Sequence, residues 1–300
     1  MLRRFLPLVL VAAVVGAAAF WVVTRPAPVD EAALAPISGD AARGQRVFHA
    51  TGCASCHAAE GARGEAKLVL SGGRRFASPF GTFLAPNISP DPDHGIGGWT
   101  LGQLSRAIQH GVGPGGEHLY PALPYTSYIR IEPQDVADLY AFLRTLPPDA
   151  TPSQPHEVGF PFNIRRLLGG WQLLFLTDDW VVAGPLTEQE TRGRYLVEAM
   201  GHCGECHTPR NRLGAMEKSR WLAGAPNPAG QGRIPNITPA GLDWTEAEIV
   251  TYLTEGTTPD YDTVGGEMSA VVDELAQLPI EDVEAIAAYL KKVPSVTAAP

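Results

Sequence analysis

Two five-residue segments, Cys53-Ala54-Ser55-Cys56-His57 and Cys203-Gly204-Glu205-Cys206-His207, decide how this chain folds. They contain all four cysteines of the 300 residues. Paired cysteines in an exported chain often form disulfides, and a Cys-x-x-Cys pair often serves zinc or redox chemistry. Neither use explains a histidine directly after the second cysteine in both segments. Covalent haem attachment does, because two thiols bond the porphyrin and the adjacent histidine binds its iron.

The sequence therefore predicts two covalently bound haem c groups, one on each attachment segment. The predicted covalent attachment points are Cys53, Cys56, Cys203 and Cys206. His57 and His207 are the predicted proximal ligands of the two irons. Since no fifth cysteine remains, a thiolate cannot bind either iron from the opposite, distal side.

The chain repeats itself with an offset of roughly 150 residues. Similar segments lie before the attachment segments, after them and at a later helix start: 44–48 with 193–197, 87–90 with 236–239, and 99–100 with 244–245. Each repeat is expected to contain a helix, the attachment segment, an irregular wrap, a helix, a loop and a last helix. Strict period-two alternation is almost absent, so the fold is predicted to be mainly α.

Capping signals and apolar spacing set the predicted helix boundaries. Expected N-terminal caps are Asp40, Thr100 with Gln103, Thr187 with Glu190, and Thr245 with Glu248. Gly111 and Gly256 should end the middle helices in a left-handed conformation. Apolar residues at i, i+3, i+4 and i+7 over 136–143 and 283–290 predict an amphipathic last helix in each repeat.

The distal ligands are predicted from position. Met268 lies between the second and third helices of its repeat, where thioether ligation of iron is expected. The first repeat has no methionine there, but Gly115-Gly116-Glu117-His118 aligns without a gap on Gly265-Gly266-Glu267-Met268. This alignment makes His118 the hypothesis for the first haem. His94 and His110 are rivals, and a vacant or weakly bound iron is the remaining alternative.

A proline-rich linker, 151–186, separates the repeats and contains a short apolar segment over 167–176. This segment is too short to cross a bilayer. We expect it to pack between the domains, and a partner-docking surface is the alternative.

The N-terminus carries Arg3 and Arg4 before an uncharged run over 5–24. Such a run predicts a single transmembrane helix, with residues 1–25 as an anchor of the inner membrane and the haem domains on its periplasmic side. The alternative is a cleaved signal peptide with the small residues 17–19 at its cleavage site.

The formal net charge is −9. Nucleic acid is therefore not an expected partner, because binding it requires a concentrated basic face. An acidic surface would suit a basic patch on a protein partner, although it equally serves solubility.

Several segments carry a family resemblance: 85–92, 95–99, 118–125, 161–165 and 201–211. Together they resemble the cytochrome c subunits of membrane-bound bacterial dehydrogenases of the alcohol and gluconate dehydrogenase type. The resemblance covers about residues 40–293 and implies periplasmic electron transfer from a catalytic subunit toward quinone or a terminal oxidase. Those subunits commonly carry three haems, and many have Met where this chain has Leu123. The ligand of their first haem therefore cannot be transferred to this chain.

Together these features predict two tandem class I cytochrome-c-like domains, 38–150 and 187–294, behind an N-terminal transmembrane helix. We expect a non-catalytic electron-transfer subunit of the respiratory chain. Its expected donor is a dehydrogenase of the flavin, quinoprotein or molybdenum type, and its acceptor a quinone, a small cytochrome or a terminal oxidase. The chief alternative is a dihaem peroxidase-like enzyme with an open first haem.

Overall fold

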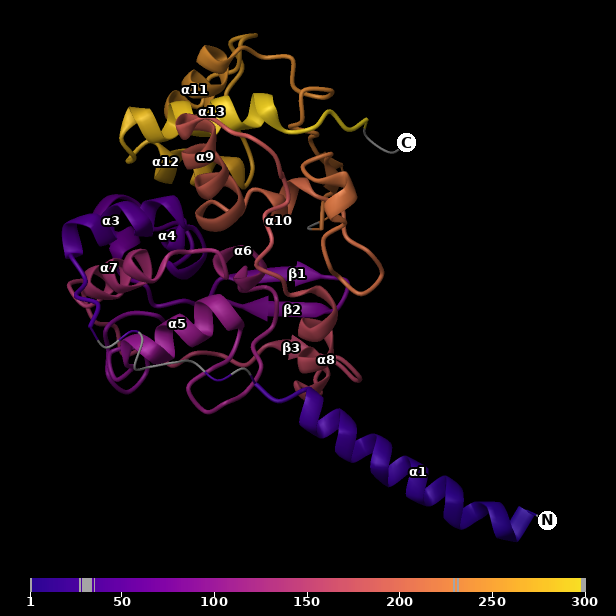
Figure 1. The fold of residues 1–300 in the computed structure, drawn as a ribbon. Helices are drawn as coiled ribbons and strands as arrows, with labels where there is room; N and C mark the ends of the chain where they lie inside the picture. Colours follow the sequence, from indigo (N-terminus) through magenta and orange to yellow (C-terminus); the bar gives the residue numbers. More distant parts are fainter. Residues whose placement is uncertain are drawn as a thin grey trace.

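The computed structural model describes residues 2–26, 28, 34, 36–228, 230 and 232–297, with side chains from residue 8 onward. The two repeats form two helical units that pack against each other, and α1 (Leu2–Val23) extends away from both (Figure 1). The predicted mainly α fold is confirmed for these residues, whose β-structure is limited to short strands.

The helices follow the same order in both repeats. The first repeat contains α3 (Ala41–Ala50), α4 (Cys53–His57), the 3-10 helix η1 (Gly64–Leu68), α5 (Leu101–His110), α6 (Tyr125–Tyr128) and α7 (Pro133–Leu143). The second contains α9 (Glu188–Arg194), the π-helix η2 (Tyr195–Met200), α10 (Gly204–His207), the 3-10 helix η3 (Lys218–Arg220), α11 (Glu246–Glu255), α12 (Met268–Leu275) and α13 (Ile280–Lys292).

The predicted helix caps are all present. Thr100, Thr187 and Thr245 form capping boxes with Gln103, Glu190 and Glu248, and the side chain of Asp40 accepts a hydrogen bond from the Arg43 amide. Gly111 and Gly256 end α5 and α11 at φ values of 60° and 72°. Because these signals satisfy free amides and carbonyls locally, the sequence could place them without knowledge of the packing.

Two glycines allow the first and last helices of each repeat to cross at very close range. A Cβ at Gly44 in α3 would overlap the carbonyl oxygen of Asp138 in α7, and one at Gly193 in α9 would overlap that of Ala285 in α13. Around these crossings lie fully buried side chains such as Phe48 and Tyr289. Each crossing fixes the helix that leads into an attachment segment.

The linker is tied to both repeats. Its strand β3 (Glu157–Val158) pairs with β2 (Gly81–Leu84), which pairs in turn with β1 (Arg75–Ser78), all antiparallel. Farther along the linker, the buried carboxylate of Glu198 in η2 accepts hydrogen bonds from the Val181 and Val182 amides and from the Tyr289 hydroxyl. A second hairpin pairs β4 (Ala225–Pro226) with β5 (Arg233–Ile234).

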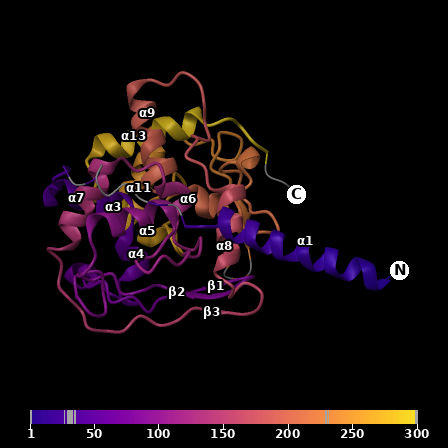
Figure 2. The same ribbon diagram turned by 60° about the horizontal axis from the view of Figure 1, so that its bottom comes forward.

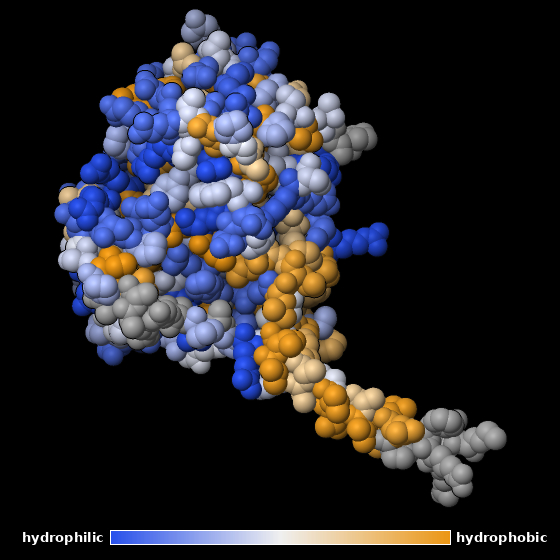
Figure 3. Space-filling model, viewed as in Figure 1, coloured by the Kyte–Doolittle hydropathy of each residue, from blue (hydrophilic) through white to orange (hydrophobic). Residues whose placement is uncertain are grey.

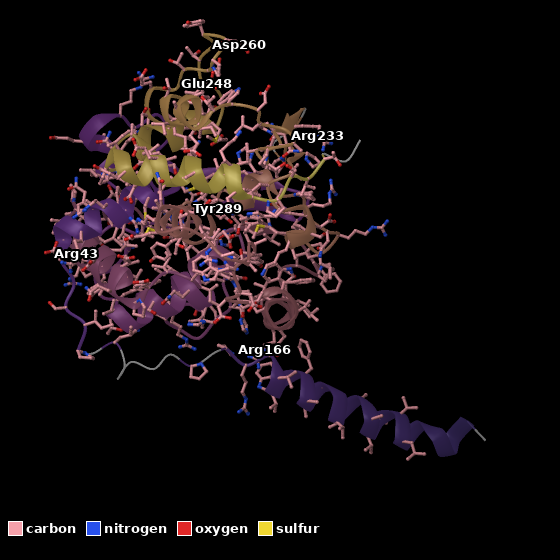
Figure 4. The ribbon with its side chains drawn as sticks, turned by 45° about the horizontal axis from the view of Figure 1, so that its top comes forward. Arg43, Arg166, Arg233, Glu248, Asp260 and Tyr289 are labelled. Carbon is pink, nitrogen blue, oxygen red and sulfur yellow. The ribbon has the colours of Figure 1, made fainter. Side chains whose placement is uncertain are left out.

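The apolar segment of the linker forms α8 (Arg166–Phe175), which lies beside the end of α1 (Figure 2). Arg166 stacks on Trp21 with 4.3 Å between the guanidinium carbon and the ring centroid, and its place at the base of α1 is visible in Figure 4. One side of α8 contacts both repeats, whereas Leu173 and Leu174 are 61% and 71% exposed. The segment is therefore only partly the interdomain packing helix that the sequence predicts.

The prediction of an N-terminal transmembrane helix is wrong. Within the described residues, no helix has both the length and the apolarity needed to cross a membrane. The described side chains of α1 run from Leu8 to Val23 and are exposed and apolar (Figure 3). The side chains of residues 5–7, which complete the uncharged run, lie outside the described part.

Candidate haem sites

Both attachment segments fold into one helical turn directly after the first helix of their repeat. Gly52 precedes α4 in the left-handed conformation, with φ of 60°, and Cys203 precedes α10. Because Cys53 and Cys56 are three residues apart in such a turn, both thiols lie on the same side. No disulfide joins the four cysteines, and desolvation raises the pKa of the Cys53 and Cys203 thiols to about 12.

The two predicted proximal histidines have identical partners. The Nδ1 of His57 donates to the Pro86 carbonyl and the Nδ1 of His207 to the Pro235 carbonyl, each over 2.8 Å. This bond orients the ring and leaves Nε2 free to bind iron, as in metal-binding histidines generally. Burial lowers the pKa of both imidazoles, which favours the neutral form that a metal requires. Two thiols beside a neutral, oriented histidine fit a covalently bound haem.

Met268 is the first residue of α12. Its side chain is half-buried and packs against the hydrophobic core. Its role as the distal ligand of the second haem stays a prediction.

His118 is buried at 3% exposure. Its Nε2 lies 2.9 Å from the carbonyl oxygen of Thr24, just after α1, and its Nδ1 lies 2.8 Å from Oε1 of Gln172 in α8. Both ring nitrogens are therefore taken by contacts outside the haem domain. Ligation by His118 stays a prediction, and it would require one of its ring nitrogens to leave its oxygen partner.

The backbone hydrogen bonds define how the two distal loops correspond. Val112 bridges His118 in the first repeat, and Thr257 bridges Thr263 in the second. The Leu119 amide donates to the Gly111 carbonyl over 2.7 Å, and the Val264 amide donates to the Gly256 carbonyl over the same distance. These pairs share an offset of 145 residues, since 263 − 118 and 264 − 119 both equal 145.

In this register His118 corresponds to Thr263, and Met268 corresponds to Leu123 (268 − 145 = 123). The gapless alignment of the two Gly-Gly-Glu segments uses an offset of 150 and is not the structural one (268 − 118 = 150). The gapless alignment fails because similar residues in two short loops need not occupy equivalent positions when the flanking helices set another register. His118 is therefore not the structural counterpart of Met268.

The attachment segments of the two repeats meet at one interface. The Thr51 carbonyl, two residues before Cys53, accepts a 2.9 Å hydrogen bond from the Tyr128 hydroxyl and lies 3.3 Å from Nε2 of His202, next to Cys203. Desolvation raises the pKa of Cys206, and the neighbouring charge of Glu205 raises it further.

A reciprocal pair of contacts, which we call the clasp, joins each attachment segment to the distal loop of the other repeat. The Thr126 hydroxyl of α6 donates to Oε1 of Glu205, inside the second attachment segment, over 2.5 Å. Conversely, Arg74 donates to the Ser55 carbonyl inside the first attachment segment and to Oε2 of Glu267, beside Met268, over 3.0 Å. The clasp therefore connects both distal loops to the opposite haem site.

Further ion pairs fix α12 on the first repeat. His49 of α3 lies 2.7 Å from Glu274, and Lys67 of η1 lies 2.8 Å from Asp273. Neither these pairs nor the clasp was predicted from the sequence. Their partners lie about 80 to 225 residues apart, so no local pattern marks them.

Comparisons with known proteins agree with these sites. The cytochrome c family model matches residues 41–147. A dihaem c-type cytochrome of Cereibacter sphaeroides is 60% identical over 97% of each chain. The fructose dehydrogenase cytochrome subunit of Gluconobacter japonicus is 40% identical over 84% of this chain and 52% of its own length. The cytochrome c subunit of a quinone alcohol dehydrogenase of Gluconacetobacter polyoxogenes is 36% identical over 85% and 56%.

The chain spans about half the length of these two dehydrogenase subunits but nearly all of the dihaem relative. The resemblance to dehydrogenase cytochrome subunits is thereby confirmed. With two attachment segments and a relative that matches over nearly its whole length, this chain belongs to the dihaem c-type cytochromes and carries two covalently bound haem c groups.

Proposed function

We propose that this chain relays electrons from the catalytic subunit of a periplasmic dehydrogenase to an acceptor of the respiratory chain. Relatives that are dehydrogenase cytochrome subunits support a partner of this kind. The partner's cofactor would be a flavin, a quinone or molybdenum, and the acceptor a quinone, a small cytochrome or a terminal oxidase. The basic residues Arg3 and Arg4 before an apolar run support export to the periplasm.

The contact between the two attachment segments is the observation that carries this proposal. A relay requires two redox groups close enough for an electron to pass directly between them. The Thr51 carbonyl contacts both Tyr128 and His202, and the clasp secures the same interface from both sides. The points at which the two haems are attached thus lie on a shared, fixed surface.

The bound haems supply iron that cycles between the ferrous and ferric states. The protein's own groups set the conditions for that cycle. The Pro86 and Pro235 carbonyls orient His57 and His207, so that each Nε2 remains available and the imidazole stays neutral.

The proposal is tested on the complex that purifies with an affinity-tagged version of this full chain. D-fructose and ethanol, the substrates that the names of the relatives suggest, are added separately to the oxidised complex while the absorbance of ferrous haem is followed. We expect one such dehydrogenase substrate to reduce both haems of the chain. Hydrogen peroxide is the comparison reagent and should be consumed no faster than by free cytochrome c.

A complex in which the catalytic subunit turns over with an artificial dye while the haems stay oxidised would contradict the relay. Rapid peroxide consumption coupled to haem oxidation would instead favour the peroxidase-like alternative. Both results are read from the same preparation, because the dye assay confirms that the dehydrogenase is active.

A further inference from the structure

Leu123 occupies in the first repeat the place that Met268 occupies in the second. Each lies five residues after its bridge residue, His118 or Thr263. Both side chains are half-buried and pack against the hydrophobic core. Leu123 lies two residues before α6, which begins at Tyr125, and Met268 is the first residue of α12.

Counting back from the last helices gives a different residue, which also cannot bind iron. Val136 in α7 corresponds to Val283 in α13, an offset of 147 (283 − 136 = 147). This register places Pro121 opposite Met268 (268 − 147 = 121). Neither leucine nor proline has a side-chain lone pair that could bind iron. From either flank, the first repeat therefore lacks a ligand at the position of Met268.

Most other possible ligands near the first haem have partners among the described residues. The buried hydroxyl of Tyr125 has no hydrogen-bond partner there, but its ring packs edge-on against Trp171 of α8, with 6.2 Å between the ring centroids. His118 contacts Thr24 and Gln172, and the ring of His156 accepts a hydrogen bond from the Leu84 amide. The remaining paired groups are His49 with Glu274, Lys67 with Asp273, Tyr120 with Phe162 and Tyr128 with Thr51. His94 is exposed on the wrap, and His110 is half-buried at the last residue of α5.

We propose that the iron of the first haem has an exchangeable sixth position. The apolar side chain of Leu123 covers this position without binding iron, so that a small ligand of iron can bind there. The ligand class is a compact neutral or anionic molecule, such as carbon monoxide or cyanide. The second haem, opposite Met268, is closed to the same ligands. The site depends on the haem attachment already established and not on the electron relay, so the two conclusions can fail separately.

The test uses the holoprotein with both haems attached and titrates the reduced form with carbon monoxide. The wild type should bind one carbon monoxide per chain, and its oxidised form should show one high-spin and one low-spin haem by EPR. Leu123→Met supplies the missing thioether and should lower carbon monoxide binding at least tenfold, with both haems low-spin. Leu119→Met, a half-buried leucine in the same loop, is the matched control and should behave as the wild type.

Two low-spin haems and no carbon monoxide binding in the wild type would overturn the proposal. His118→Ala and His110→Ala would then identify the true ligand, because removing it must create a high-spin first haem. If our proposal is correct, each of these two variants still binds one carbon monoxide per chain. Electron passage between the haems, measured separately after rapid reduction, can persist in either outcome.

Discussion

The two haem sites have the same proximal side and different distal sides. In both repeats the attachment histidine donates to a proline carbonyl over 2.8 Å, and the incoming helix crosses the last helix at a glycine. In the distal loops, by contrast, the second repeat has Met268 at the position where the register of the bridges gives Leu123 in the first repeat. Covalent attachment holds a haem even where its distal ligand is lost, so the distal loop can diverge while the proximal side is retained. The predictions below proceed from the largest expected effect to the smallest.

Removing one attachment segment should abolish one of the two sites altogether. Cys203→Ala with Cys206→Ala should halve the covalent haem, because thioether bonds survive denaturation and loss of axial ligands. Haem stain and absorbance per chain after denaturation measure this. Ser55→Ala, which alters an attachment segment without removing a thiol, should keep two haems. A wild-type chain with a single covalent haem would disprove the symmetry of the proximal sides.

Gly193→Ala should selectively destabilise the second repeat. The added methyl group meets the Ala285 carbonyl in α13, a backbone atom that cannot move aside cheaply. We expect a loss of about 3 kcal/mol in the free energy of unfolding. Denaturant titration followed at the second haem gives the value. Gly265→Ala, where a Cβ meets nothing within 4 Å, is the control, and equal losses in both variants would refute the close crossing.

Met268→Leu should make the second site resemble the first. Loss of the thioether should lower the potential of the second haem, because methionine ligation raises it. The oxidised protein should then contain two high-spin haems, and the reduced protein should bind two molecules of carbon monoxide per chain. EPR and the same gas titration measure both effects. An unchanged second haem would show that Met268 only fills the core.

Weakening the clasp should have the smallest effect. Thr126→Val removes the hydroxyl that Glu205 accepts from, and Arg74→Gln removes the charge opposite Glu267. We expect losses of about 1 kcal/mol for the first and about 0.5 kcal/mol for the second, because Glu267 is largely exposed. Electron exchange between the haems should slow by no more than about fivefold.

The matched controls for the clasp carry similar contacts that do not join the two repeats. Thr254→Val loses a hydroxyl that bonds only within its own helix, to the Val250 and Thr251 carbonyls, and Arg75→Gln breaks the exposed pair with Glu157 of the linker. Rapid mixing with a one-electron reductant measures exchange, and denaturant titration measures stability. If the control variants slow the exchange as much as Thr126→Val and Arg74→Gln do, the clasp has no special role.

The sequence by itself determined the cofactor, the repeat and the helix boundaries. Each attachment segment needs only five neighbouring residues, and each cap needs a side chain three positions from its amide, as with Thr100 and Gln103. Such interactions lie within one turn of chain, so they can be found without knowledge of the fold. The first and last helices were predictable for the same reason, from the spacing of their apolar residues.

Only the tertiary structure decided which residues face each other across the repeats. The distal register depends on Val112 bridging His118 and on Thr257 bridging Thr263, and this backbone pairing overrode the similarity of two Gly-Gly-Glu segments. Contacts such as His49 with Glu274 join positions 225 residues apart. Nothing in the local sequence records these pairings, because they arise when separately formed helices bury their apolar faces together.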